Sequence, residues 1–305
     1  MSISKETMPS LFSFSLLLVS GCLIAVMLPL ARVVTDAGLS PIVYAFWQSL
    51  GAGLLLLGFG WKRLKFRINY RFLRYCIISG LTGVALPNAL AFWIVGEIGP
   101  GFTATLYAFP PIFTLVFSLF MRIERPNCRR VAGVGLACAG CFWIVLSQMD
   151  VVPSSTFGWY LIGLLVPLSL GLGNVYRSVA WPPGLDPVAL AAGMMLGASI
   201  LLLCALSLDS GADLLPTLER SKTYSLVVFQ MLLTALTYLS FFELQKRSSP
   251  LFLSQMGCIA ALVGLLIGMS FFGEQYALGV WLGVLVVLLG LWMNNSVKPD
   301  PLTSD

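Results

Sequence analysis

Eight polar or aromatic side chains within the long apolar stretches of this sequence are of the types that could bind a small molecule. They are Tyr44, Trp47, Gln48, Asn88, Tyr107, Asn174, Tyr238 and Gln255. Polar groups in hydrocarbon cost free energy, so they usually face the interior of a helix bundle or a water-filled path. Amide and hydroxyl groups donate and accept hydrogen bonds without carrying a charge. The set therefore predicts one central cavity that binds a neutral or zwitterionic ligand.

The spacing of these residues puts several of them on shared helix faces. Tyr44, Trp47 and Gln48 follow the i, i+3, i+4 pattern of one face. Asn88 and Tyr238 are 150 residues apart, so equivalent faces of two similar segments carry unusual residues. The alternative is that polar stripes are packing faces between membrane helices, and that Trp47 belongs to an aromatic belt at the membrane surface.

Catalytic and metal chemistry find little support in the sequence. It contains no His, and its one CxxC, from Cys138 to Cys141, has no second pair to complete a metal set. Catalysis would need paired acids or an activated nucleophile, and neither an HExxH nor a GxSxG motif occurs. We therefore expect a protein that is not an enzyme, with no catalytic residues, no metal and no cofactor.

The elements that must position the polar residues are long apolar helices. The chain is 58% hydrophobic and only 10% charged, with a mean hydropathy of +0.91, whereas soluble proteins carry about 25% charged residues. The sequence predicts an all-α polytopic membrane protein with ten transmembrane helices, and nine or eleven are the alternatives. The apolar runs, each long enough to span a bilayer, lie near 11–31, 41–61, 72–96, 101–121, 130–148, 157–177, 187–207, 222–245, 250–272 and 277–295.

The distribution of Lys and Arg between these runs predicts the orientation. With ten helices and the N-terminus inside, fifteen basic residues fall in cytoplasmic segments, and Arg177 is counted among them. Arg32, Arg220 and Lys222 fall outside. Because basic residues concentrate in cytoplasmic loops, we expect both termini in the cytoplasm. We also expect the protein to lie in a bacterial inner membrane.

An internal repeat appears when the sequence is shifted by 150 residues. Pro100 then falls on Pro250 and Glu124 on Glu274, and Gly133 and Gly140 fall on Gly283 and Gly290. The predicted units are residues 1–148, residues 149–298 and a tail of residues 299–305. Because five helices is an odd number, the second unit is inverted in the membrane, as in many secondary transporters. The glycines predict close packing of the fifth and tenth helices, or a homodimer through them.

Two segments at the ends of these units carry a recognisable pattern. Residues 119–143, LFMRIERPNCRRVAGVGLACAGCFW, and residues 269–292, MSFFGEQYALGVWLGVLVVLLGLW, each contain a helix, a Glu loop and a Gly-spaced helix. This pattern resembles the EamA type of the drug/metabolite transporter superfamily. Members often carry an Arg on the second helix after a Ser-Pro pair. Here Ser40 and Pro41 are followed by Gln48 in that place, which argues against an anionic substrate.

The resemblance implies transport of a small metabolite, most often export of an amino acid, by alternating access. The alternatives are efflux of drugs or of nucleobase or nucleoside metabolites, and a channel-like or structural membrane subunit. The expected partners are a small-molecule substrate and the lipid bilayer, with no nucleic acid.

The acidic residues leave the energy source open. No Asp or Glu lies near the centre of a predicted span, so facilitated diffusion and proton antiport are equally expected. Glu243 precedes Lys246 and Arg247, which predicts a local ion pair. Glu124 and Glu274 sit at helix junctions, where a carboxylate stabilises a helix N-terminus.

Overall fold

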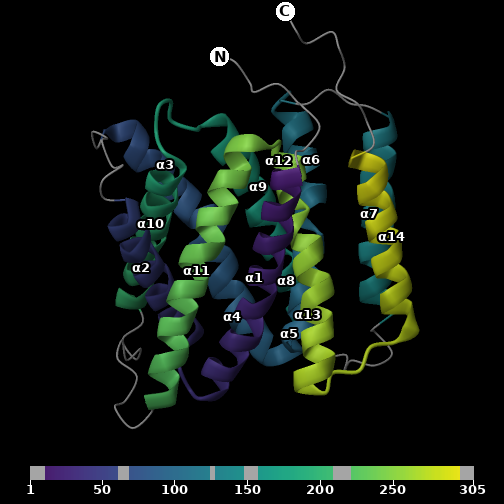
Figure 1. Cartoon of the computed structure of the whole chain (residues 1–305). Helices are drawn as coiled ribbons and strands as arrows, with labels where there is room; N and C mark the ends of the chain where they lie inside the picture. The colour runs from purple at the N-terminus through teal and green to yellow at the C-terminus, as the bar shows by residue number, and fades with distance from the viewer. Residues whose placement is uncertain (1–10, 61–68, 124–127, 148–156, 209–220, 296–305) are drawn as a thin grey trace, which may run out of the picture.

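The computed structural model describes residues 11–60, 69–123, 128–147, 157–208 and 221–295, and these form a bundle of roughly parallel helices (Figure 1). No β-strand occurs in this described part of the chain. The α-helices are α1 (Leu11–Asp36), α2 (Pro41–Gly60), α3 (Tyr70–Gly80), α4 (Leu86–Ile98), α5 (Pro100–Thr105), α6 (Pro110–Phe120), α7 (Cys128–Leu146), α8 (Phe157–Gly163), α9 (Leu165–Val179), α10 (Pro187–Ser207), α11 (Ser221–Arg247), α12 (Pro250–Ser254), α13 (Met256–Phe272) and α14 (Leu278–Asn295).

Eight segments in the described residues are long and apolar enough to cross a membrane. Two shorter apolar helices, Val131–Ile144 and Leu278–Gly290, lie within α7 and α14. Apolar side chains cover the outside of the bundle, as lipid contact requires; Phe59, Phe120 and Phe271 are examples. The chain is therefore a polytopic, all-helical membrane protein.

Four of the spanning segments in the described residues are broken into two helical pieces. A π-helix (Leu81–Ala85) joins α3 to α4, and a 3₁₀-helix (Leu106–Ala108) lies between α5 and α6. Further breaks separate α8 from α9 and α12 from α13. Proline has no N–H to donate, and Pro87 and Pro110 lie beside the first two breaks. Broken helices are tolerated in a membrane where the freed backbone groups are buried in protein or line a cavity.

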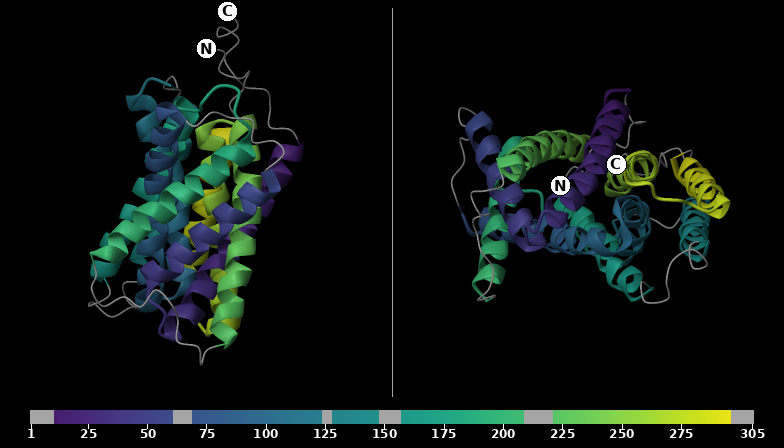
Figure 2. Two further views of the ribbon diagram at one scale, coloured as in Figure 1. Left: turned by 90° about the vertical axis from the view of Figure 1, so that its left-hand side faces the viewer. Right: turned by 90° about the horizontal axis from the view of Figure 1, so that it is seen from below.

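The main core lies between α1, α2, α4, α10, α11 and α13. The pair α7 and α14 lies together at one edge of the bundle (Figures 1 and 2). A Cβ on Gly140 would lie 2.8 Å from the Gly283 carbonyl oxygen, so glycine lets these two backbones touch. The glycine stripe that suggested a homodimer contact therefore packs within one chain.

The start of α1 and the end of α14 lie at the same end of the bundle (Figure 1). The basic C-terminal turn of α11, with Lys246 and Arg247, lies at that end too. The junctions of α1 with α2, of α4 with α5 and of α13 with α14 lie at the opposite end. We call the first end the terminal end and the second the far end.

Candidate substrate-binding site

A cavity of about 50 Å³ lies among the broken helices. Its walls come from α1, the π-helix, α4, the 3₁₀-helix and the start of α6 in the first half of the sequence, and from α9, α11, α12 and α13 in the second half. Its polar lining side chains are Asn88, Tyr107, Asn174, Arg177, Thr237, Tyr238 and Ser254. The rest of the lining is mostly apolar, with Met27, Phe92 and Phe241 among it. A largely apolar pocket with a few polar groups is the usual form of a small-molecule site.

Four of the eight residues that the sequence predicted for one cavity come together here. Asn88, Tyr107, Asn174 and Tyr238 all line it, although they come from four different elements. The amide nitrogen of Asn88 is buried and has no hydrogen-bond partner. A buried unpaired donor costs free energy, so this group is poised to bind a ligand.

The other four, Tyr44, Trp47, Gln48 and Gln255, are not among the residues that line this cavity. The physical reason for the first three is that α2 packs mainly against α10 and α11. Tyr44 lies behind Phe92, with ring centroids 5.1 Å apart, and Trp47 packs on Phe46.

Gln48 and Gln255 have other positions. The side-chain amide of Gln230 donates a hydrogen bond of 2.8 Å to the Gln48 carbonyl oxygen, and both residues are fully buried. Gln48 therefore joins α2 to α11. Gln255 occupies the break between α12 and α13, next to the lining residues Ser254 and Met256.

The π-helix presents a backbone carbonyl to α11. Pro87 has no N–H with which to bond the carbonyl of Gly83 four residues earlier. The hydroxyl of Tyr238 donates to that carbonyl oxygen at 3.1 Å. This bond ties α11 to the break in the third spanning segment, at the wall of the cavity. Bulges of this kind are frequent at functional sites.

Arg177 is a lining residue that the sequence analysis missed. Its assignment to a cytoplasmic loop is wrong, because it lies in the last turn of α9 and is only 1% exposed. Its guanidinium donates to the side-chain oxygens of Asn174 at 2.6 Å and Gln245 at 3.2 Å. Its position three residues after Asn174 was the available signal, since i and i+3 share a helix face.

Two glycines make room for the Arg177 guanidinium. A Cβ on Gly83 would overlap its Nη1, and a Cβ on Gly173 would lie 2.9 Å from the same atom. The guanidinium carbon also lies 5.0 Å from the centroid of the Phe241 ring, in cation–π range. The surrounding chain is therefore shaped to hold this cation.

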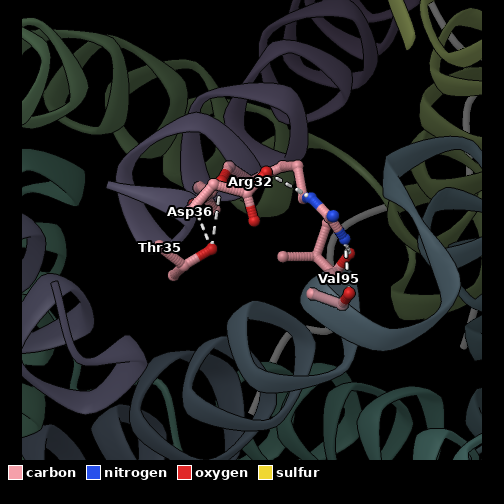
Figure 3. A network of polar contacts seen from close by, with 6 residues as sticks. Arg32, Thr35, Asp36 and Val95 are labelled. Atoms are coloured by element: carbon pink, nitrogen blue, oxygen red, sulfur yellow. Dashed lines mark hydrogen bonds and ion pairs between the residues drawn. The ribbon is translucent and has the colours of Figure 1, made fainter. Parts of the chain in front are cut away.

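At the far end, Arg32 ties α1 to the end of α4 (Figure 3). Its Nη1 donates to the carbonyl oxygen of Val95 at 3.0 Å and to that of Gly96, and its Nε pairs with Asp36 at 2.7 Å. Carbonyls at a helix C-terminus attract cations. The bonds to Val95 and Gly96 therefore join the two helix ends, while Asp36, on α1 itself, orients the guanidinium.

Glu274, between α13 and α14, contacts α5 at the far end. Its carboxylate accepts from the Gly101 amide at 3.2 Å and from the Tyr276 hydroxyl at 2.6 Å. Burial, and then the hydrogen bond to Glu274, raise the pKa of Tyr276, so it stays a donor at neutral pH. The Tyr276 ring also packs edge-on against Phe102. Glu274 thus stabilises the N-terminus of α5; Glu124, its repeat partner, lies outside the described residues.

Glu243 forms the local ion pair that the sequence predicted. Its carboxylate accepts from Arg247 Nε at 2.6 Å, on an exposed face of α11. Among the described residues no carboxylate pairs with Arg177.

The EamA-like transporter family model matches residues 11–146 and again residues 157–296. Among curated proteins, the chain is 25% identical over 250 residues to the uncharacterised transporter YoaV of Bacillus subtilis, covering 81% of this chain and 84% of that protein. It is 22% identical over 284 residues to a WAT1-related protein of Arabidopsis thaliana, covering 87% and 82%. Among the solved structures that match, one crystal structure has a TM-score of 0.66 and 16% identity, covering 93% of this chain and 95% of that one, which supports the fold.

These matches agree with the polytopic, all-helical structure described above. The family match spans almost the whole chain, and the family and the Bacillus subtilis relative are transporters rather than enzymes. The chain therefore belongs to the EamA-like family of the drug/metabolite transporter superfamily, and it is an integral membrane transporter.

Proposed function

We propose that this chain is a secondary transporter that moves a small metabolite through the cavity by alternating access. The observation that carries the proposal is the composition of the cavity wall. Asn88 and Tyr107 come from the first predicted unit, and Asn174 and Tyr238 come from the second. A site between two repeats, built on discontinuous helices, suits a mechanism in which the repeats rock about a fixed ligand.

The architecture that we propose is ten spans in two inverted five-helix units, residues 1–148 and 149–298. Two successive matches to one family model support the duplication. The common end for the start of α1 and the end of α14 supports an even number of crossings. In this scheme α7 and α14 are the fifth and tenth spans.

The orientation that we propose has the terminal end in the cytoplasm of a bacterial cell, with the protein in the inner membrane. The excess of basic residues at that end supports it. The ties of Arg32 and Glu274 then lie on the outer side and hold it shut. An Asn69→Cys variant is expected to react with an impermeant thiol reagent only from inside, and labelling from outside intact cells would reverse the orientation.

The substrates that we propose are amino acids and related metabolites of that size, exported from the cytoplasm. The second candidate is efflux of drugs or of nucleobase-type metabolites, which the aromatic groups Phe92, Tyr107 and Phe241 would suit. The absence of a central charge no longer argues for a neutral substrate, since Arg177 lies in the cavity wall.

The test is uptake and counterflow in liposomes that contain the purified protein. The panel consists of amino acids, their deaminated analogues, nucleobases and cationic drugs, each with and without a pH gradient. We expect saturable uptake of at least one class, accelerated by the same compound on the other side. No uptake of any compound, or unsaturable conduction, would contradict the proposal.

A pair of Asn variants tests whether the cavity is the route. Asn88→Ala removes an unpaired donor from the cavity, so transport should fall several-fold, since a neutral hydrogen bond contributes about 0.5–1.5 kcal/mol. The matched control is Asn69→Ala, which removes the N-cap of α3 outside the cavity. Equal transport by both variants would exclude Asn88 as a substrate contact.

A further inference from the structure

We propose that Arg177 binds the carboxylate of the substrate, and that the preferred substrates are apolar monocarboxylates without an ammonium group. This inference rests on the transport function proposed above and names the chemical class that the same cavity selects. It departs from the sequence-based expectation of a neutral or zwitterionic ligand. Among the amino acids and related metabolites proposed above, it ranks the deaminated monocarboxylates above the amino acids themselves.

The charge of Arg177 lacks a counter-charge from the protein. The residue is 1% exposed inside a membrane helix bundle, and no carboxylate in the described ranges pairs with it. Glu243, on a neighbouring helix, is already paired with Arg247. A buried charge is costly unless an opposite charge offsets it. Intramembrane cations of this kind mark substrate pathways, and an anionic ligand would supply the missing charge.

The hydrogen bonds of the guanidinium leave donors for such a ligand. A guanidinium has five N–H donors in a planar fork. One bonds Gln245, one bonds Asn174, and Nη1 lies 3.9 Å from the Met194 sulfur, a weak acceptor. The remaining donors find no acceptor in the described part of the chain. A planar fork with free donors matches a carboxylate.

The position of Arg177 is held from several sides. Gly83 and Gly173 provide the space that its Nη1 occupies. Asn174 and Gln245 orient it from α9 and α11. The unpaired amide of Asn88 lines the same cavity and offers one more donor to an anion. These contacts fix the guanidinium where it can bind a negative group of a ligand.

The rest of the lining selects against a second charge. No Asp or Glu is among the lining residues, so an ammonium group would enter without a carboxylate partner. Most of the wall is apolar or aromatic, including Met27, Phe92, Leu170 and Phe241. The body of the ligand is therefore apolar. A zwitterionic amino acid would bind through its carboxylate but more weakly than its deaminated analogue.

The first experiment uses the wild-type protein in liposomes and needs no variant. The probes are 3-phenylpropionate, its neutral isostere 3-phenylpropanamide, the zwitterion phenylalanine and the cation phenethylamine. We expect uptake of 3-phenylpropionate at least about tenfold more efficient than that of the amide, in the range of a charge-assisted hydrogen bond. Phenylalanine should fall between them, and phenethylamine should not be carried. Equal uptake of the acid and the amide would overturn the assignment of Arg177.

The second experiment changes the residue. Arg177→Gln should lose most of the uptake of the acid while retaining that of the amide, and Arg177→Lys should retain part of the uptake of the acid. Arg71→Gln, on an exposed face of α3, is the matched control and should behave as wild type. Retained amide uptake also demonstrates that the Gln variant is folded. If that variant transports the acid normally, the inference is wrong.

The two proposals fail in different ways. If no compound in the two panels is taken up, the transport function is refuted. Saturable uptake that shows no preference for carboxylates would leave that function standing and refute the role of Arg177. If neither Arg177 variant folds, the ratio of acid to amide uptake in the wild-type protein decides.

Discussion

The hydroxyl of Tyr238 donates to the carbonyl oxygen of Gly83 at 3.1 Å, across the gap between α11 and the π-helix. We expect Tyr238→Phe to destabilise the protein by about 1 kcal/mol, because it removes a hydrogen bond from a carbonyl that Pro87 leaves without its helical donor. The ring remains, so packing should change little. Thermal unfolding in detergent measures the effect. A Tyr70→Phe variant, at the exposed start of α3 and outside the cavity, is the control, and an equal loss in both would contradict the prediction.

Gly83→Ala should damage transport far more than an ordinary helix substitution. The new Cβ would overlap Arg177 Nη1, so the guanidinium must leave its place or the π-helix must shift. Overpacking of this kind costs about 1–3 kcal/mol. The matched control is Gly58→Ala in α2, where a Cβ meets nothing within 4 Å. Uptake of 3-phenylpropionate by both variants is the measurement, and normal uptake by the first would show that the tight contact has no functional role.

Gln48→Ala should reduce stability rather than substrate affinity. It leaves the Gln230 amide buried without its acceptor, at a cost of about 1–3 kcal/mol. The double variant Gln48→Leu with Gln230→Leu should recover much of the loss, because both polar partners are then gone. Thermal unfolding and the Michaelis constant for uptake separate the two effects. A raised Michaelis constant at unchanged stability would return Gln48 to the substrate site.

Glu274→Ala should loosen the far end of the bundle. The Gly101 amide loses its acceptor, and Tyr276 loses the partner of its hydroxyl. Hydrogen–deuterium exchange of peptides covering residues 98–106 should therefore speed up, because exchange reports local opening. Glu97→Ala removes an exposed carboxylate at the same end and serves as the control. Unchanged exchange in the first variant would mean that the carboxylate does not hold this end shut.

The long apolar helices were predictable because the hydropathy of each segment follows directly from its residues. The run near 101–121 corresponds to the segment Pro100–Phe120, and the run near 222–245 lies within α11. Caps and prolines set the ends: Asn69 caps α3, and Pro187 and Pro250 begin α10 and α12. The π-helix at Leu81–Ala85 was not predicted, because one extra residue in a long apolar span does not alter its mean hydropathy, although it rotates the helix face beyond it.

The site was predictable only in part, and the errors have a common physical cause. Helical spacing tells which residues share a face, but not which neighbour that face meets. Asn88 and Tyr238 face the cavity, whereas Gln48 faces Gln230 on a neighbouring helix. Arg177 was misplaced because a basic residue near a helix end fits the positive-inside pattern. Only the packing of α9 against the π-helix, and the hydrogen bond from Arg177 to Gln245 on α11, distinguish a buried cation from a loop charge.

A fixed positive charge in the wall of the cavity also bears on what must not cross the membrane. Protons and sodium ions that enter the empty cavity approach Arg177 in a medium of low dielectric constant, where like charges repel strongly. Positive groups serve as barriers to cations in the same way in water-conducting and anion-conducting pores. The residue that we assign to substrate binding is therefore also expected to repel cations from the cavity, which would limit cation leak through a carrier that moves without cargo.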